Sequence, residues 1–439
     1  MKVLKFGGSS VGSAQRMKGV AKLVDDGQQK IVVLSAMSGT TNSLVEIGNY
    51  YLNGNHQGAA DMIVALESKY SAHVSELYST QEYRQKAWTV LSGIFDFLRS
   101  FAGKAFGPKE EKAVLAQGEL MSTNMFALYL QECGKDVCLL PALEFMRIDA
   151  ASEPDLPFIA EHLKDMLAHN KAYLYVTQGF ICRNTSNDFD NLQRGGSDYS
   201  ASLIGAAVKA EEIQIWTDID GMHNNDPRVV EGTSAVHHIH FEEASELAYF
   251  GAKILHPTCI QPAKNANIPV RILNTMQHEA EGTLITNRLE TGLIKAVAAK
   301  DNIAAIRIKS SRMLLAYGFL RKVFEIFEKY KTSIDMICTS EIGVSLSVDD
   351  TSHLNEIVHE LKKYGTVSVD LDMCIVCVVG DMNWENVGFE TKAMQAIKDI
   401  PVRMVSYGGS NYNISFLVRE EDRDRTLKAL SRSLFDQKN

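Results

Sequence analysis

The first residues of the chain that could do chemistry are Lys5, Gly7 and Gly8, within the stretch 3–11. A short apolar run ends there in a glycine-serine turn, and a helical pattern follows. Because glycines lack Cβ atoms, backbone N–H groups at the turn can approach an anion closely, and the positive end of the next helix adds to the attraction. Lys5 places a full positive charge beside the turn. The pattern predicts a phosphate-binding loop, although tight glycine turns also follow strands that bind nothing.

Two further turns carry a similar signature. Residues 35–42 are small and rich in hydroxyls, and they separate the apolar run 31–34 from a helical stretch. Since the carboxyl ends of neighbouring parallel strands meet at one edge of a sheet, we expect this turn and the first one to share a crevice. In the third turn, Arg194 and Asp198 flank Gly195 and Gly196 before an alanine-rich helix. A structural ion pair between Arg194 and Asp198 is the alternative to a binding role.

Other candidate groups lie on predicted helices and strand ends. Glu119 lies one turn into a predicted helix, where a glutamate is more often a solvated surface residue than a ligand. The strand pattern 213–218 ends in Thr217 and Asp218, and a loop follows to residue 228. The loop at 250–257 offers Lys253 as a second mobile cation.

Two clusters invite a metal interpretation, one of them with CxxC spacing, but the residues around each cluster argue against a metal site. His237, His238 and His240 have few carboxylates and no cysteine nearby. Cys374 and Cys377 are three apart in a strand-like run, where they would point to opposite faces. The seven cysteines form an odd and scattered set, which favours a reducing compartment over a disulfide framework.

Composition indicates an ordinary globular protein of two to three domains: 439 residues, 45% hydrophobic and 23% charged. The net charge of −9 argues against nucleic-acid binding, so an anionic substrate must be met by local basic residues. Apolar runs are far too short to span a bilayer, and the start of the chain has no signal-peptide pattern. We therefore expect no membrane or nucleic-acid partner and a cytoplasmic location.

The order of predicted elements indicates an α/β fold with a regulatory tail. Strand–turn–helix units open the chain, a helical stretch covers 56–133, and strands return between 137 and 286. In the last third, residues 318–337 align with 388–405 at an offset of 70. Each copy reads helix, strand, strand, helix, which is typical of a ferredoxin-like βαββαβ unit.

Five motifs together resemble the aspartokinases of the amino-acid kinase superfamily. In chain order they are Lys-Phe-Gly-Gly-Ser-Ser-Val at 5–11, Gly-Glu-Leu-Met-Ser at 118–122, Arg-Gly-Gly-Ser-Asp at 194–198, Trp-Thr-Asp with Asp-Pro-Arg at 216–228, and Gly-Ala-Lys-Ile-Leu-His-Pro at 251–257. The resemblance covers essentially the whole chain. It implies the amino-acid kinase fold, a mainly parallel sheet between helical layers, over 1–295. Two ferredoxin-like ACT units would follow, the first over 310–370 and the second over 296–309 plus 371–439.

The resemblance also implies an activity: phosphoryl transfer from ATP, with Mg²⁺, to the side-chain carboxylate of L-aspartate. No P-loop or protein-kinase motif occurs in the chain, so the glycine turns must hold the nucleotide. The implied catalytic residues are Lys5 and Asp198. The implied ATP contacts are Lys5, Gly7, Gly8, Ser9, Thr217, Asp218, His223, Arg228 and Lys253, although His223 stands where the family usually has tyrosine. The implied aspartate contacts are Thr41, Glu119, Arg194 and Ser197.

Paired ACT units imply feedback by an amino acid and at least a homodimer. Resemblance to lysine-sensitive aspartokinases favours L-lysine, bound near Met313, Gly318, Phe319, Leu320, Ser333, Ile334, Asp335, Thr339 and Ser340. Leu315 and Ala316 replace a polar pair of those relatives, so we expect weak inhibition. Two alternatives stay open: a glutamate-type amino-acid kinase, and a catalytically inactive amino-acid sensor.

Overall fold

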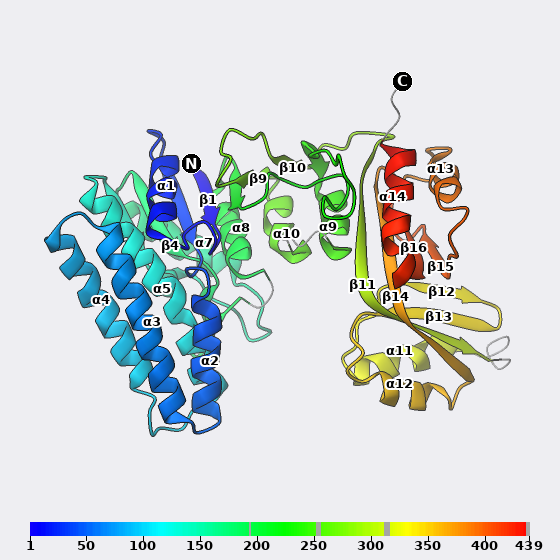
Figure 1. The fold of residues 1–439 in the computed structure, drawn as a ribbon, viewed down its shortest axis with the longest axis horizontal. Helices are drawn as coiled ribbons and strands as arrows, with labels where there is room; N and C mark the ends of the chain where they lie inside the picture. The colour runs from blue at the N-terminus through cyan, green and yellow to red at the C-terminus, as the bar shows by residue number, and fades with distance from the viewer. Residues whose placement is uncertain (193–194, 252–255, 311–316, 436–439) are drawn as a thin grey trace. The chain divides into compact units, whose positions relative to one another are not determined.

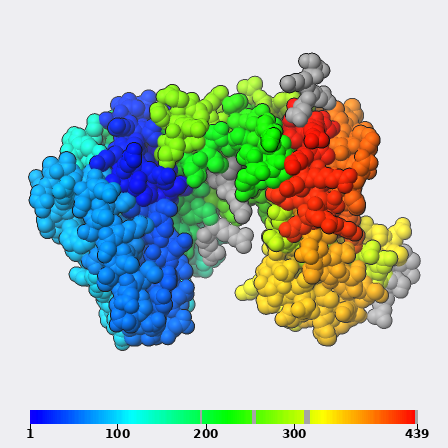
Figure 2. All heavy atoms as spheres, viewed as in Figure 1, coloured from blue at the N-terminus to red at the C-terminus, as the bar shows by residue number. Residues whose placement is uncertain are grey.

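The computed structural model describes residues 1–192, 195–251, 256–310 and 317–435, and it forms two compact units (Figures 1 and 2). The N-terminal unit contains Met1–Met222 and Leu255–Asn287, and the C-terminal unit contains His223–Ile254 and Arg288–Asn439. Residues 223–254 fall within the sequence range that we predicted as one N-terminal domain, yet they group with the C-terminal unit.

The N-terminal unit is built on a mainly parallel sheet in the order β3-β4-β2-β1-β7-β9-β10. Neighbouring strands pair in parallel except for β10, which runs antiparallel to β9. Every residue of β2 is buried, as expected for a strand covered on both faces. The bounds are β1 Lys2–Phe6, β2 Lys30–Leu34, β3 Val137–Leu140, β4 Leu174–Gln178, β7 Ile213–Thr217, β9 Val270–Asn274 and β10 Thr283–Thr286. The predicted fold class is confirmed.

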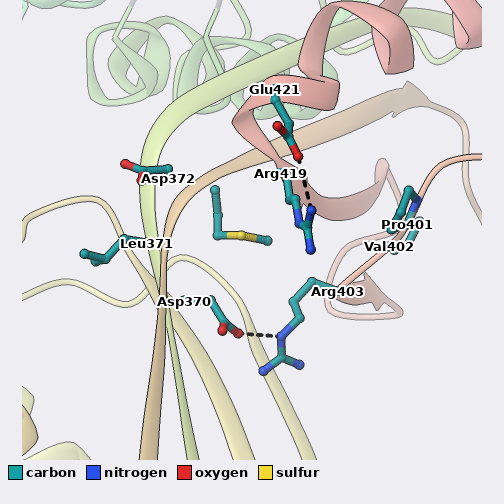
Figure 3. Close-up of a pocket in the computed structure, with 9 residues that line it drawn as sticks. Asp370, Leu371, Asp372, Pro401, Val402, Arg403, Arg419 and Glu421 are labelled. Carbon is teal, nitrogen blue, oxygen red and sulfur yellow. Dashed lines mark hydrogen bonds and ion pairs between the residues drawn. The ribbon is translucent and has the colours of Figure 1, made fainter.

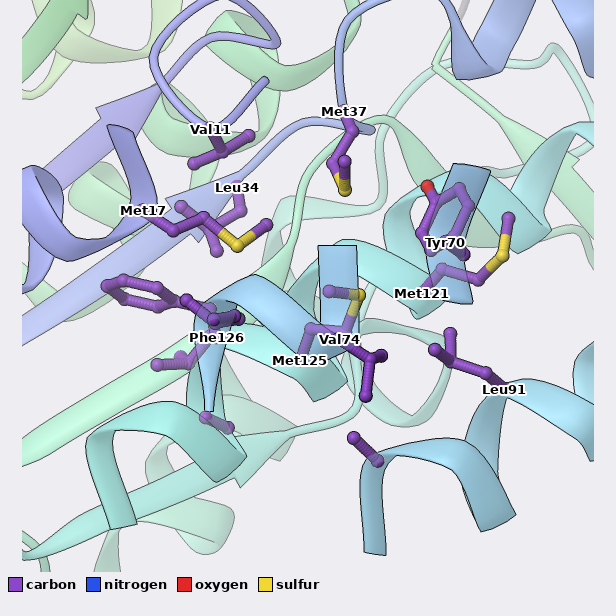
Figure 4. Close-up of a cluster of buried hydrophobic side chains, with 14 of the residues drawn as sticks. Val11, Met17, Leu34, Met37, Tyr70, Val74, Leu91, Met121, Met125 and Phe126 are labelled. Atoms are coloured by element: carbon purple, nitrogen blue, oxygen red, sulfur yellow. The ribbon is translucent and has the colours of Figure 1, made fainter. Parts of the chain in front are cut away.

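Helices cover the sheet and form a large hydrophobic core with it. Apolar side chains of α1, α3, α4 and α5 pack with those of β1 and β2, and methionines such as Met17, Met121 and Met125 fill the gaps (Figure 4). The predicted helical stretch over 56–133 is confirmed by three long helices. The bounds are α1 Ala14–Val24, α2 Thr40–Leu52, α3 His56–Leu77, α4 Gln81–Arg99, α5 Pro108–Glu132, α6 Ala142–Phe145, α7 Leu156–His169, α8 Gly196–Val208 and α10 Pro257–Asn265, with a hairpin of β5 Ile181–Arg183 and β6 Phe189–Asn191.

The C-terminal unit contains an antiparallel sheet in the order β12-β13-β11-β14-β16-β15. Its two central strands are long and run through the whole unit (Figure 1). The bounds are β11 Ile294–Lys309, β12 Ile337–Ser340, β13 Gly343–Val348, β14 Thr366–Gly380, β15 Met404–Tyr407 and β16 Asn413–Arg419; α9 Phe241–Tyr249, α11 Phe319–Lys329, α12 Leu354–Leu361, α13 Phe389–Ala396 and α14 Arg423–Leu434; and β8 His238–His240.

Among the described residues of this unit, two hydrophobic cores correspond to the two copies of the internal repeat. The inner half comprises the second part of β11, α11, β12, β13, α12 and the first part of β14, and it packs around Val323, Phe327 and Leu346. The outer half comprises the first part of β11, the second part of β14, α13, β15, β16 and α14, and it packs around Phe416 and Leu427. The repeat predicted from the sequence is therefore a pair of βαββαβ halves that share their central strands.

Candidate functional site

The glycine turn after β1 lies against the turn after β2, as the sequence predicted. The Ser38 N–H donates to the Gly8 carbonyl at 3.1 Å. A Cβ atom on Gly8 would lie 2.8 Å from the carbonyl oxygen of Ala36, so a larger residue would push the two turns apart. The Gly7 N–H donates to the Trp216 carbonyl at 3.3 Å, which also ties the turn to the end of β7. Three strand ends therefore meet at one crevice.

Lys5 and Asp198 form an ion pair beside this crevice. Their charged atoms lie 2.6 Å apart, and their side chains are 12% and 16% exposed. Lys5 comes from β1, and Asp198 comes from the first turn of α8, next to the glycines that begin that helix. A Cβ atom on Gly7 would lie 3.5 Å from the Lys5 ammonium, so this charge lies directly over the glycine turn. Lys5, Gly7, Gly8 and Asp198 are thus brought together.

Glu119 reaches the same crevice from α5, where it is only 5% exposed. Its carboxylate accepts the Ala36 N–H at 3.2 Å. Gly118 allows this approach, because a Cβ atom there would lie 2.8 Å from the Ala36 side chain. Burial raises the pKa of Glu119 to about 7, and the backbone hydrogen bonds that it accepts only partly oppose the rise. Glu119 is not the solvated surface residue that its helical position alone suggested.

Ser197 also contacts the turn after β2. The Ser35 hydroxyl donates to the Ser197 hydroxyl at 2.9 Å, and Ser197 is almost fully buried. Thr41, which we predicted to complete this pocket, is exposed in the first turn of α2. The buried hydroxyl belongs to its neighbour Thr40, whose oxygen lies 2.9 Å from that of Tyr70.

Sequence reasoning missed other polar groups at the strand ends. The Ser10 and Thr275 hydroxyls lie 2.7 Å apart, and the Thr275 N–H donates to the Thr217 carbonyl at 2.8 Å. Thr217 in turn donates to Asp218 at 3.2 Å. A hydroxyl within two residues of the end of a predicted strand is the signal that could have identified Ser35 and Thr275.

The remaining predicted contacts belong to the C-terminal unit or lie outside the described residues. His223 and Arg228 belong to the C-terminal unit, where Arg228 pairs with Asp226 at 2.8 Å and is largely exposed. Arg194 and Lys253 lie outside the described residues.

The predicted effector residues lie in the inner half of the C-terminal unit, except Met313, which lies outside the described residues together with Leu315 and Ala316. Gly318 begins α11, Phe319 is buried in its first turn, and Thr339 and Ser340 are exposed on β12. The Asp335 carboxylate, which we expected to face a ligand, is fully buried and is held by Lys300 at 2.7 Å and by the Tyr249 hydroxyl at 2.5 Å. Burial raises the pKa of Asp335, and Lys300 opposes the rise.

Among the described residues, no group of three His, Cys, Asp or Glu side chains could hold a metal ion. The seven cysteines are free thiols. No helix within the described ranges is long and apolar enough to cross a membrane.

Comparisons with known proteins agree with the motifs and the fold. A model of the amino acid kinase family matches residues 1–274, and an ACT domain model matches residues 376–434. Aspartokinase 1, chloroplastic, of Arabidopsis thaliana is 34% identical over 99% of this chain and 80% of its own length. Lysine-sensitive aspartokinase 3 of Escherichia coli is 33% identical over 99% of both chains.

Solved structures show the same architecture. Escherichia coli aspartokinase III in complex with aspartate and ADP matches with a TM-score of 0.84 at 32% identity, over 99% of this chain and 100% of that one. Clostridium acetobutylicum aspartate kinase matches with a TM-score of 0.86 at 26% identity, over 99% and 100%. With the motifs, the fold and these relatives in agreement over the whole chain, the protein belongs to the aspartokinase family.

Proposed function

We propose that the crevice around Lys5 transfers the terminal phosphoryl group of ATP to the side-chain carboxylate of L-aspartate, giving 4-phospho-L-aspartate and ADP. The observation that carries this proposal is the Lys5–Asp198 pair above the Gly7–Gly8 turn. A relative at 32% identity has been solved with aspartate and ADP, the substrate and product that this reaction requires.

The chemistry requires charge stabilisation and no general base. An aspartate side chain has a pKa of about 3.9, so it is already an ionised nucleophile at neutral pH. Its approach to the phosphates brings two anions together. Lys5 and the N–H groups of the glycine turn offset that repulsion and stabilise the charge on the transferring phosphoryl oxygens. Asp198 holds the Lys5 ammonium in place over the turn. Lys253 is a second candidate cation.

Mg²⁺ fits the donor set at this crevice. It favours carboxylate oxygens together with substrate phosphates, and the candidate carboxylates are Asp198, beside Lys5, and Asp218, which directly follows β7. When bound, the ion neutralises phosphate charge. Ser9, Thr217 and Asp218 hold the nucleotide in this proposal, and His223 and Arg228 are further proposed contacts.

Recognition of the α-amino acid falls to groups around the turn after β2. The buried Glu119 carboxylate accepts hydrogen bonds from the substrate's α-ammonium, and the planar Arg194 guanidinium binds its α-carboxylate. Ser197 lies across the turn from Glu119, with Ser35 between them. Thr41, which is exposed on α2, is a further proposed contact.

For regulation we propose the division given by the family: a catalytic domain over 1–295, a first ACT domain over 310–370, and a second over 296–309 plus 371–439. The two cores of the C-terminal unit support the nested ACT assignment. L-Lysine is the proposed effector, at the residues named above in the inner half. Binding to Asp335 would require Lys300 to move.

The test is ADP release with L-aspartate in a coupled assay. Lys5→Ala should lower turnover on the order of 10²-fold while ATP binding persists, because a charge aimed at the transition state is lost. Lys22→Ala, an exposed lysine on α1, is the matched control and should behave like the wild type. Near-native turnover of Lys5→Ala would remove this residue from catalysis. Turnover with L-glutamate in place of L-aspartate would favour the glutamate-type alternative, and no turnover with either would favour the sensor.

A further inference from the structure

The C-terminal unit has an internal two-fold symmetry that creates two equivalent crossovers. These are the places where β11 and β14 pass between the inner and outer halves, and their pairing is irregular there. Asn302 has φ +60° at the first crossover, and Asp372 has φ +54° at the second. Exchanging β11 with β14, β13 with β16 and β12 with β15 reproduces the strand order. Lys300 and Asp370 therefore occupy equivalent positions, each two residues before the left-handed residue.

Each crossover carries an ion pair to the residue that leads into an edge strand. The Asp335 N–H donates to the Ser347 carbonyl before β12, and the Arg403 N–H donates to the Leu417 carbonyl before β15, so these residues are also equivalent. Lys300 pairs with Asp335 at 2.7 Å, and Asp370 pairs with Arg403 at 2.7 Å. The same contact is made twice with its charges reversed.

The ion pair at the first crossover is covered by a side chain that comes from outside the two repeated halves. Tyr249 comes from α9, outside both halves, and its hydroxyl bonds to Asp335. The Lys300 ammonium lies 4.2 Å from the centre of the Tyr249 ring and 2.8 Å from Asp349. The Asp335 side chain is left with no exposed surface.

The second crossover is open. A cavity of about 570 Å³ lies there, lined by Asp370, Arg403, Arg419 and Glu421 and by apolar side chains that include Met373 and Val402. Figure 3 shows the side chains of Arg403, which precedes β15, and Arg419, at the end of β16, beside the same space; Arg403 is bonded to Asp370 and Arg419 to Glu421. Arg403 bonds Asp370 through Nε, so its terminal nitrogens are not used in that contact.

The lining of this cavity has the charge pattern of an amino-acid site. Two guanidinium groups match a carboxylate, and nearby carboxylates match ammonium groups. Asp370, Asp372 and Glu421 line the cavity together with the two arginines, so the lining carries an excess of one negative charge. The apolar side chains suit an alkyl stem, and the volume is in the range of small-ligand pockets.

We propose that the cavity at the second crossover binds an α-amino acid with a cationic side chain. It is separate from the effector residues proposed in the inner half. The role of this cavity in feedback rests on the proposed function, whereas the binding of an amino acid to it does not. A ligand there would contact the strand that joins the two halves, and by linkage any effect on aspartate affinity must be reciprocal.

The experiment is calorimetric titration of the full-length protein with L-lysine, alongside inhibition of ADP release. Arg419→Met should weaken binding at this cavity by ~10-fold, because one charged hydrogen bond is lost. The double variant Asp370→Arg with Arg403→Asp keeps the ion pair, so it should fold, yet it should weaken binding similarly because the guanidinium is displaced. Arg425→Met, an exposed arginine on α14, is the control and should bind like the wild type. Norleucine, which lacks the side-chain ammonium, and cadaverine, which lacks the carboxylate, should each bind more weakly than lysine.

The outcomes separate this site from the proposed feedback. Lysine binding that depends on Arg419 supports the cavity, even where the wild-type enzyme shows no inhibition and the feedback proposal fails. Lysine inhibition with binding that is unchanged in Arg419→Met and in the double variant overturns the cavity and leaves the feedback intact. Absence of saturable lysine binding to the wild type, or equal binding of norleucine, also overturns it.

Discussion

Replacing Glu119 by glutamine should make the protein more stable and less active at alkaline pH. The pKa of Glu119 is about 7 in the folded protein, against an ordinary value of 4.5. Between these two values the unfolded chain loses its proton while the folded protein keeps it, so stability falls as pH rises through this window. The full loss, about 2.5 pH units at 1.36 kcal/mol each, is about 3 kcal/mol above pH 7. A glutamine side chain at this position would carry no charge and would avoid this penalty.

Stability is measured by urea unfolding at two pH values. At pH 8 the Glu119→Gln variant should be more stable than the wild type by up to about 3 kcal/mol, and near pH 4 the two should agree, because Glu119 is protonated in both states there. Glu111→Gln, on the same helix and only partly buried, is the control and should show no such gain.

Activity should change in the opposite direction. Only ionised Glu119 can bind the substrate's α-ammonium, so kcat/KM for aspartate in the wild type should fall about tenfold between pH 8 and pH 6. In Glu119→Gln the KM for aspartate should rise at least ~10-fold, with little change across this range. A variant that keeps the tenfold fall, or that is less stable than the wild type at pH 8, would refute the role given to this carboxylate.

Three other changes test separate features. Gly8→Ala should abolish most activity and raise the KM for ATP, since the new Cβ atom would lie 2.8 Å from a neighbouring carbonyl oxygen. Gly19→Ala has open space around it and should raise the free energy of unfolding in urea by about 0.5–1 kcal/mol. Lys300→Met should destabilise by about 2 kcal/mol, because it leaves the buried Asp335 carboxylate with the Tyr249 hydroxyl but no cation; unchanged stability would contradict that view. Sedimentation at micromolar concentration should show at least a dimer, because β12 and β15 are the edge strands of the C-terminal sheet and edge strands can pair with a second copy; a monomer would contradict this.

Much of the proposed catalytic site could be predicted from the sequence because its signals are local. A lysine two residues before a glycine pair, and a glycine turn that opens a helix, specify backbone geometry within a few residues. Parallel strands then bring such turns to one edge of the sheet, which is why the contact between Gly8 and Ser38 was predictable. The offset of 70 residues likewise predicted two similar halves before any contact was known.

Side-chain burial near these motifs was not predictable from spacing. Thr40 and Thr41 are adjacent in the sequence, and only the rotation of α2 against α3 decides which of them is buried against Tyr70. The helical position of Glu119 suggested a surface residue, but its burial depends on the packing of α5 against the turn after β2.

The regulatory half shows most clearly what the sequence by itself determined and what only the tertiary structure decided. The sequence determined the repeat, because each copy contains its own turns and apolar periodicity. The tertiary structure decided that the Asp335 carboxylate is covered by neighbouring side chains, whereas a cavity remains beside the Asp370–Arg403 ion pair. That difference depends on Tyr249, which lies 86 residues before Asp335 and outside the repeat. Local propensity acts over a few residues, whereas such a contact exists only once the chain path brings distant segments together.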